Sequence, residues 1–382
     1  MTANLRHAAG SLLVVGLAGT ELSGLERAWL RLIRPSGVIL FRRNVCDARQ
    51  TRALLADAIG LCAPHALRCV DVEGGTVDRL RDALAPMPPA QAVAQKAGIS
   101  GKFKLCEQHG ELIARGVKAF GFNATLAPVL DLALPASAQV MGTRSAAADA
   151  AGVVAYARGF LAGLGAHGVA GCGKHFPGLG GGALDSHSET PTIRRSFTEL
   201  WREDLAPYRE LRDQLPMVMV NHAAYPQTPG GMRPATVSKF WITTILRKRM
   251  GYRGILFSDD MEMGGILKFL PIDEAALTAV RAGIDLLEIC HSPELILRAY
   301  EALVCESEKS AVFRALLLDR AREATRKRAR LIPAAFSPAL SPRQFEAIRN
   351  RILRFRESFD ECAPVSRAPG LARQTLVHAE TA

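Results

Sequence analysis

Short apolar runs recur along the chain, and each is followed by a longer segment whose apolar residues have helical spacing. The runs are apolar at consecutive positions rather than at alternate ones, which is typical of parallel strands buried on both faces. Glycine, proline or charged residues bound each run. The eight predicted strands are Leu12–Leu17, Val38–Phe41, Arg68–Val72, Phe122–Leu130, Val169–His175, Met217–His222, Ile255–Ser258 and Ile284–Ile289.

The segments between these runs supply the crossovers that parallel pairing requires. Predicted helices include Asp47–Leu61, Gly101–Phe120, Ala146–Gly165, Ser196–Asp213 and Ser238–Met250. Eight consecutive strand–helix units favour an α/β fold of the closed (β/α)8 TIM-barrel type, with a doubly wound open sheet as the alternative.

Polar residues at the ends of the runs favour the barrel. A barrel gathers the ends of all its strands on one face, where barrel active sites lie, whereas an open sheet would spread them along an edge. These residues are Arg43, Asn44, Asp71, Glu73, Asp131, Lys174, His175, Asn221, His222, Asp259, Asp260, Glu288 and His291.

The repeating pattern ends near residue 332 of the 382. We therefore expect a single catalytic domain over residues 1–332, followed by a short C-terminal extension over residues 333–382. That extension contains a proline-rich linker, a helix from Gln344 to Phe359 and a polar tail. Arg6 before the first apolar run loosely resembles a secretory signal, but that run is needed as the first strand. No stretch approaches the roughly 20 uninterrupted apolar residues that span a membrane.

The chain is basic, with 48 Lys and Arg against 37 Asp and Glu and a net charge of +11. An acidic partner is conceivable, but charge density alone seldom marks a site. We interpret the basic residues over 320–330 as the solvated face of a terminal helix and do not expect nucleic acid as a partner.

The eight cysteines include no C-x-x-C pair and no Cys/His cluster that would suit tetrahedral zinc. We expect neither a disulfide scaffold nor a metal site, and no cofactor. Cys69, Cys172 and Cys290 lie within apolar runs, as free thiols of a reducing compartment do, which favours the cytoplasm.

A glycine-rich segment follows the fifth predicted strand and carries Asp185 and His187. In an extended segment both side chains leave the same side, so the carboxylate can hold the imidazole in one tautomer and raise its basicity. This pair is a candidate general acid/base. The alternative is a surface loop in which both are only turn residues.

The seventh predicted strand ends in two adjacent carboxylates, Asp259 and Asp260. Since consecutive side chains of a strand diverge, we expect only one of them to point into the barrel mouth. A carboxylate in a partly dry pocket can attack an acetal carbon and form a covalent glycosyl-enzyme. A helix cap or a salt bridge is the alternative role.

Asp71 is delivered to the mouth by the third predicted strand, and the pair Gly74-Gly75 allows the backbone to approach a ligand closely. The glycine pair is not a dinucleotide fingerprint, because no G-x-G-x-x-G follows a strand, and the chain has no P-loop.

Taken together, six motifs resemble glycoside hydrolase family 3, and more narrowly its single-domain bacterial β-N-acetylglucosaminidases that recycle cell-wall fragments. They occur in the family's order and spacing between Leu12 and Ile289. The motifs are Ile39–Asn44, Val70–Gly75, Leu126–Asp131, Lys174–Gly178, Asp185–His187 and Phe257–Asp260.

The resemblance implies a retaining mechanism with Asp259 as nucleophile and His187, oriented by Asp185, as acid/base. It makes Asp260 a structural partner and His222 a wall of the pocket. The positions that match those holding the terminal sugar are Asp71, Arg79, Arg144, Lys174 and His175.

This chain departs from the family pattern at two places. Leu179-Gly180 replaces the usual His-Gly pair, and Thr143 replaces the usual Asn before Arg144. Both lie near the glycine-rich segment or the sugar, so they bear on the reaction rate or on the motion of that segment rather than on the reaction type.

The resemblance predicts a monomeric β-N-acetylhexosaminidase that releases terminal, non-reducing β-linked N-acetylglucosamine from muropeptides ending in 1,6-anhydro-N-acetylmuramic acid. The basic surface would suit such acidic substrates. Two alternatives stay open: a glycoside phosphorylase or β-glucosidase of the same family, and a non-catalytic sugar-binding or sensor protein that has kept the barrel.

Overall fold

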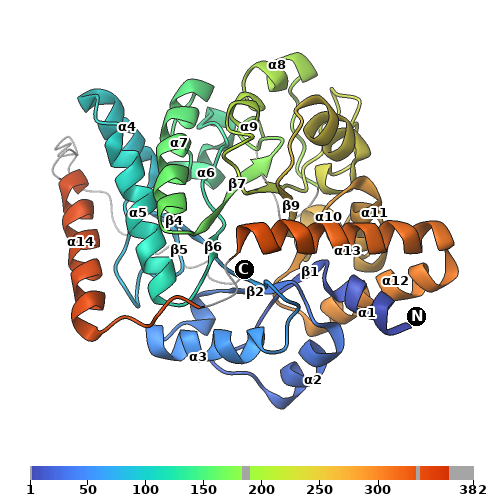
Figure 1. Cartoon of the computed structure of the whole chain (residues 1–382). Coiled ribbons are helices and arrows are strands. Elements are labelled where there is room, and N and C mark those ends of the chain that lie inside the picture. Colours follow the sequence, from blue (N-terminus) through green and yellow to red (C-terminus); the bar gives the residue numbers. More distant parts are fainter. Residues whose placement is uncertain (1, 183–189, 333–335, 361–382) are drawn as a thin grey trace, which may run out of the picture.

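Eight parallel strands close into a barrel in the computed structural model, which describes residues 2–182, 190–332 and 336–360 (Figure 1). The order around the barrel follows the chain, which confirms the predicted (β/α)8 fold and excludes the open sheet. The strands are β1 (Leu13–Gly16), β2 (Gly37–Leu40), β3 (Leu67–Val70), β6 (Ala124–Thr125), β7 (Ala170–Phe176), β8 (Met217–Val220), β9 (Ile255–Asp260) and β10 (Leu286–Ile289).

The strands are buried along almost their whole length, as expected from their consecutive apolar residues. Only Asp259 and Asp260, at the end of β9, stay partly accessible. Burial on both faces therefore holds the barrel together, and the accessible carboxylates mark its open end.

Helices surround the barrel, and polar caps start several of them. Ser23 and Glu26 form a capping box on α2, and the side chain of Asp47 caps α3. The longer helices are α2 (Gly24–Ile33), α3 (Ala48–Ile59), α4 (Ala90–Ser100), α5 (Lys104–Ala119), α7 (Ala150–Ala166), α11 (Ile272–Ala282), α12 (Pro293–Lys309) and α13 (Ala311–Leu331). The shorter ones are α1 (Thr2–Gly10), α6 (Ala138–Met141), α8 (Phe197–Arg202), α9 (Ala206–Glu210) and α10 (Gly264–Leu267).

Two predicted helices differ from expectation. The segment predicted as one helix over Ser196–Asp213 is split into α8 and α9, because Pro207 has no N–H to donate and its ring would clash with a preceding turn. The helix predicted over Ser238–Met250 is present but π-helical, over Phe240–Arg249.

The strand predicted over Phe122–Leu130 pairs in regular fashion only at Ala124 and Thr125. Pro128 lacks a backbone N–H, so the ladder cannot continue through it. The chain after Pro128 still runs beside β7, since Val129 bridges to Lys174 and the Leu130 N–H donates to the Lys174 carbonyl (2.6 Å).

A small hairpin follows β3 and was not predicted. It pairs β4 (Val72–Gly74) with β5 (Val77–Asp78) in antiparallel fashion. Gly74 has a φ of +92°, and a Cβ there would lie 2.2 Å from the Pro88 carbonyl oxygen, so only glycine fits. The hairpin holds the Glu73 side chain at the barrel mouth.

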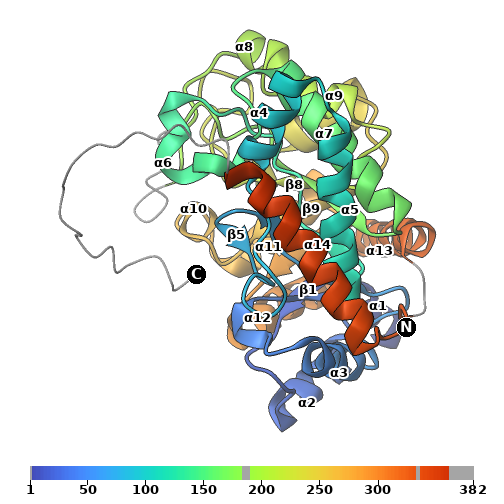
Figure 2. The same cartoon turned by 90° about the vertical axis from the view of Figure 1, so that its left-hand side faces the viewer.

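The predicted C-terminal helix is present as α14 (Pro342–Asp360) and packs across α5 (Figure 2). Ile352 is fully buried, and the ring of Phe355 stacks on His109 of α5 with centroids 6.0 Å apart. The Arg349 Nε donates to the Leu84 carbonyl (3.1 Å). We propose residues 1–332 as the catalytic domain, with this helix as an extension docked on its helical layer.

Among the described residues, no helix combines the length and the apolar character needed to cross a membrane.

Candidate active site

A cavity of about 370 Å³ opens at the carboxyl ends of the barrel strands. It brings together six of the eight catalytic and sugar-binding residues that the resemblance implied. They are Asp71, Arg79, Arg144, Lys174, His175 and Asp259. The other two, Asp185 and His187, lie outside the described residues.

A buried network of four charges lines one side of the cavity. The Lys174 Nζ lies 2.8 Å from Asp71 Oδ1 and 2.6 Å from Glu73 Oε1. The Arg144 guanidinium donates twice to Glu73, at 2.8 and 2.9 Å. Burial alone would raise the pKa of Glu73, but Arg144 and Lys174 outweigh it and hold this pKa at about 2.

Glu73 thus fixes both cations toward the cavity as a permanently charged partner. The sequence offered it only as a polar residue after a strand, and the resemblance gave it no role. The charge alternation along Asp71, Lys174, Glu73 and Arg144 presents hydrogen-bond donors and acceptors side by side, which suits the hydroxyls of a sugar.

His175 is held by Asp131, a second residue to which no role was assigned. The Nδ1 atom lies 2.7 Å from Asp131 Oδ2, which also accepts the His175 N–H (3.1 Å). The other oxygen, Oδ1, accepts the Leu179 N–H (2.7 Å). One buried carboxylate therefore orients the imidazole and anchors the start of the glycine-rich segment.

Asp259 and Asp260 both line the cavity, but the Asp260 carboxylate accepts the Glu262 N–H (3.0 Å), so the expectation that only one of them points into the mouth stays a prediction. The register between β9 and β10 shifts, because Leu286 pairs with Phe257 while Glu288 pairs with Asp260. An extra β9 residue in this bulge breaks the alternation of side chains.

Asp259 has few partners of its own. Within the part of the chain that the structure describes, its carboxylate accepts only the Asp260 N–H (3.0 Å) and forms no ion pair. It lines the cavity, and since none of the described cations neutralises it, this carboxylate is available to a substrate. His222 is the predicted wall: its Nε2 lies 2.9 Å from the Asp260 carbonyl, and burial lowers its pKa.

Two further acids beside Asp259 resist ionisation. Burial raises the pKa of Asp260 to about 7, with Glu262 and Asp259 adding repulsion. Burial also raises the pKa of Glu288 well above its usual range, and Asp71 adds to the shift. Glu288 Oε1 is buried without a hydrogen-bond partner among the described residues. Two carboxyl groups that favour the protonated form therefore lie beside Asp259 at the floor of the cavity.

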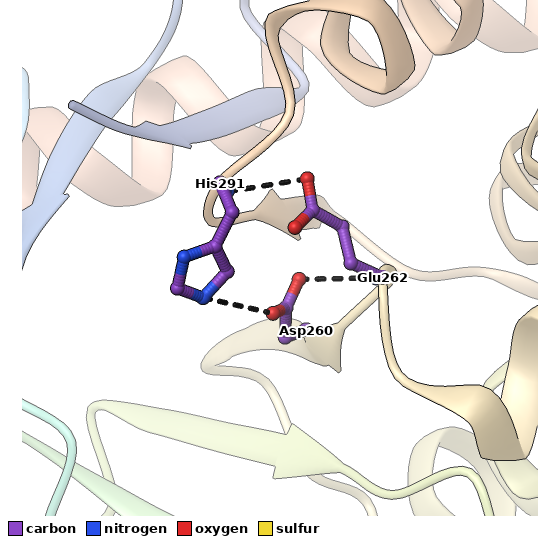
Figure 3. A group of neighbouring side chains, drawn as sticks. All are labelled: Asp260, Glu262 and His291. Atoms are coloured by element: carbon purple, nitrogen blue, oxygen red, sulfur yellow. Dashed lines mark hydrogen bonds and ion pairs between the residues drawn. The ribbon is translucent and has the colours of Figure 1, made fainter. Parts of the chain in front are cut away.

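Asp260, Glu262 and His291 point toward one another at the rim (Figure 3). Their ligand-type atoms lie within 4.8 Å, so of the described residues this group could hold a metal ion. However, Glu262 Oε1 already accepts the N–H groups of His291 (3.1 Å) and Ser292 (2.6 Å), and Asp260 Oδ1 accepts that of Glu262 (3.0 Å). These bonds tie the loop after β9 to the loop after β10.

The adjoining part of the rim is cationic and aromatic, and the Phe41 ring lies 5.2 Å from that of His291. The Arg43 and Arg79 guanidinium carbons lie 4.7 and 5.7 Å from the centre of the Phe41 ring. Among the described residues Arg79 has no ion-pair partner, and its Nε is buried without an acceptor. Arg79 can therefore bind an anionic or hydroxylated group of a ligand at the entrance.

Residues on both sides of the segment 183–189 are anchored at the cavity. Leu179 precedes it and Pro191 follows it, and both line the cavity. Arg195 Nη1 forms an ion pair with Asp204 (3.2 Å), whose side chain is 1% exposed and lies against Gly178. Burial raises the pKa of Asp204 to about 7 despite Arg195.

Asp204 should make the protein less stable as the pH rises. Its pKa in the folded protein, about 7, exceeds the ordinary value of 3.8, so between these values the folded state binds more protons than the unfolded state. The free energy of unfolding then falls by up to about 1.4 kcal/mol per pH unit in this window and levels off above it.

Urea unfolding of the wild type and an Asp204→Asn variant at about pH 5 and about pH 8 measures this contribution. The difference in the free energy of unfolding, Asp204→Asn minus wild type, should be larger at the higher pH than at the lower one. The exposed Asp213→Asn serves as control and should leave the difference unchanged. If this difference is the same at both pH values, Asp204 is ionised in the folded protein over the whole range, which contradicts the prediction.

A closed α/β barrel with a cavity of paired charges at the carboxyl ends of its strands is typical of barrel enzymes that act on small polar substrates. Comparison with known proteins specifies the class. Residues 5–322 match the glycosyl hydrolase family 3 N-terminal domain. The chain therefore belongs to glycosyl hydrolase family 3.

Its curated relatives include β-hexosaminidases. That of Methylococcus capsulatus is 40% identical over 288 residues, which cover 75% of this chain and 85% of the relative. That of Chromobacterium violaceum is 38% identical over 284 residues, covering 74% and 79%. The chain is a family 3 glycoside hydrolase that groups with these enzymes.

Solved structures agree with this grouping. Native NagZ from Neisseria gonorrhoeae aligns with a TM-score of 0.69 at 30% identity, covering 82% of this chain and 98% of that one. A family 3 β-N-acetylglucosaminidase from Paenibacillus aligns with a TM-score of 0.80 at 30% identity, covering 92% and 68%.

Proposed function

We propose that this protein is a retaining β-N-acetylglucosaminidase that removes terminal, non-reducing N-acetylglucosamine from muropeptides ending in 1,6-anhydro-N-acetylmuramic acid. One observation carries the proposal: Asp259 lines a cavity of paired charges without a partner cation among the described residues, in a chain that groups with β-hexosaminidases. A carboxylate in that position can attack the anomeric carbon of a bound glycoside.

In the proposed mechanism the Asp259 carboxylate forms a bond to the anomeric carbon while the bond to the aglycone oxygen breaks. His187, oriented by Asp185, gives its proton to that oxygen. Water then attacks the glycosyl-enzyme, its proton passes to His187, and Asp259 leaves as a carboxylate. Each residue is thereby returned to its starting state.

The terminal sugar is held by the five cavity residues that the resemblance implied. Lys174 and Arg144 offer donors whose positions Glu73 fixes, and Asp71 and His175 offer further polar atoms. Asp260 and Glu288, when protonated, reduce the negative charge around Asp259. A second full negative charge beside the nucleophile would repel the electron-rich oxygens of the bound acetal.

The choice of muropeptides rests on the cationic entrance. Arg79 and Arg43 lie at the rim, where an aglycone would extend from the sugar, and peptide-bearing aglycones carry carboxylates. The buried free thiols of Cys69, Cys172 and Cys290 suit the reducing cytoplasm in which we expect the protein to act, as a monomer.

The test follows a GlcNAc-anhydromuramyl peptide by NMR in phosphate and in phosphate-free buffer. We expect free N-acetylglucosamine in both buffers, appearing first as the β-anomer because two inversions restore the configuration. N-acetylglucosamine-1-phosphate would identify a phosphorylase, and faster cleavage of nitrophenyl β-glucoside than of the N-acetylglucosaminide would identify a β-glucosidase. Tight sugar binding without turnover would favour a sensor.

A further inference from the structure

A second cavity opens at the opposite face of the barrel. Its volume is about 640 Å³, within the range of about 300–1,000 Å³ that is usual for small-molecule sites. Pro216, Gly254 and Gly283 line it, and these residues precede β8, β9 and β10. The cavity therefore lies at the amino ends of the strands, beside α13 and the π-helix, while the catalytic cavity lies at their carboxyl ends.

The lining of this cavity is strongly cationic. Glu323 is its single acidic lining residue among those the structure describes. The basic residues that line it are Arg247, Lys248, Arg253, Arg320, Arg326, Lys327 and Arg330.

Three of these seven cations are neutralised in part by neighbours. Arg247 and Lys327 share the buried carboxylate of Asp285, at 2.6 and 2.7 Å, and Arg326 pairs with Glu323 at 2.7 Å. Burial lowers the pKa of Lys327, and Arg247 lowers it further against the pull of Asp285. The paired part of the cavity thus still has more positive than negative charge.

The remaining four cations, Lys248, Arg253, Arg320 and Arg330, form no ion pair with any residue in the described ranges. Arg320 contributes a buried Nε without a hydrogen-bond partner. Like charges gathered in a concave surface raise the local potential, and an anion that fills the space would relieve their repulsion.

We propose that this cavity binds a small anion with two or three linked phosphate groups. Two linked phosphate groups carry several negative charges at neutral pH, which the four unpaired cations can balance. The forked donors of arginine suit phosphate oxygens. A concave cluster of cations fits a compact anion, whereas nucleic acid requires an extended basic stripe.

The phosphate groups themselves, rather than an attached base, are the recognised part. Tyr252 is the aromatic residue of the described cavity lining, and it is buried, with its hydroxyl donated to the Leu215 carbonyl (3.1 Å) and Arg247 over its ring. It offers no open face for stacking. We therefore expect inorganic pyrophosphate and ADP to bind with similar affinity.

Isothermal titration calorimetry with pyrophosphate at low ionic strength tests the site. The wild type should bind one equivalent, and Arg320→Met and Arg330→Met should each weaken binding by about tenfold, the loss of one charged contact. Arg322→Met is the matched control: it lies on the same helix and removes the same charge, but Arg322 is 77% exposed and does not line the cavity.

Weaker binding in Arg320→Met and Arg330→Met, with an unchanged affinity in Arg322→Met, supports the site. Equal affinities in all three variants would overturn it, because binding would then depend at most on the net charge of the protein. Absence of saturable binding to the wild type would also overturn it, as would binding of ADP without binding of pyrophosphate. Arg330 is exposed, so its variant keeps the test valid if Arg320→Met does not fold.

A competition arm separates the two cavities. Saturating N-acetylglucosamine should leave pyrophosphate binding unchanged, because that sugar is expected at the opposite end of the barrel. Displacement of pyrophosphate by the sugar would place the anion at the barrel mouth and overturn the proposal. Hydrolysis of nitrophenyl N-acetylglucosaminide by Arg330→Met should match the wild type, which makes this site's failure distinguishable from failure of the proposed activity.

Discussion

An Asp259→Ala variant should lose activity toward nitrophenyl N-acetylglucosaminide by a factor on the order of 10⁴–10⁶, the range typical of removing a nucleophile. The carboxylate lines the cavity, accepts one backbone N–H and has no cation to neutralise it among the described residues. Without it the covalent glycosyl-enzyme cannot form. Initial rates of the purified variant, with its fold checked by circular dichroism, give this number.

Azide distinguishes a nucleophile from a merely structural carboxylate. Alanine leaves room for azide to attack the anomeric carbon, so sodium azide should restore activity to Asp259→Ala and yield the α-glycosyl azide. Asp260→Asn is the neighbouring control: it should lose far less activity, and azide should not rescue it. A wild-type adduct with a slow 5-fluoro N-acetylglucosaminide, found by mass spectrometry on any peptide without Asp259, would contradict the assignment.

A His187→Ala variant should lose kcat/KM by a factor on the order of 10²–10⁴ for a sugar aglycone, the usual contribution of a general acid. For a dinitrophenyl glycoside the loss should be small, because dinitrophenolate leaves without protonation. The structure supports a role for this segment because Leu179 and Pro191, on its two sides, both line the cavity.

The comparison of the two aglycones is the decisive measurement. Ser186→Ala, between Asp185 and His187, is the control and should keep near wild-type kcat/KM for both substrates. Asp185→Asn should fall between this control and His187→Ala, since it disturbs the imidazole without removing it. An equal loss for both aglycones in His187→Ala would mean that His187 serves binding and not proton transfer.

The barrel was predictable because its determinants are local. A buried parallel strand needs consecutive apolar residues, so runs such as Met217–Val220 and Leu286–Ile289 stand out from the sequence. The helix break at Pro207 and the short pairing of Ala124 and Thr125 have local causes too. Pro207 and Pro128 stand in the sequence and lack the backbone N–H that a helix or a ladder needs, but the predicted elements ran through them.

The candidate site was predictable as a set of residues but not as a network. Lys174 and Asp259 lie near the carboxyl ends of two strands, and the closed topology brings these ends together. That Glu73 would hold Lys174 and Arg144 could not be foreseen, because it requires the hairpin after β3 and its contact with a residue 71 positions away. The presence of both Asp259 and Asp260 at the cavity likewise accompanies a register shift between β9 and β10.

The docking of α14 has a practical consequence for anyone who shortens this chain. Phe355 stacks on His109, whose Nε2 lies 3.2 Å from the place where a Cβ of Gly74 would be, and Gly74 adjoins Glu73. The last helix thus supports the hairpin at the sugar cavity from behind. A truncation intended to preserve the enzyme should therefore end after residue 360, and not where the barrel repeat ends at Ile332.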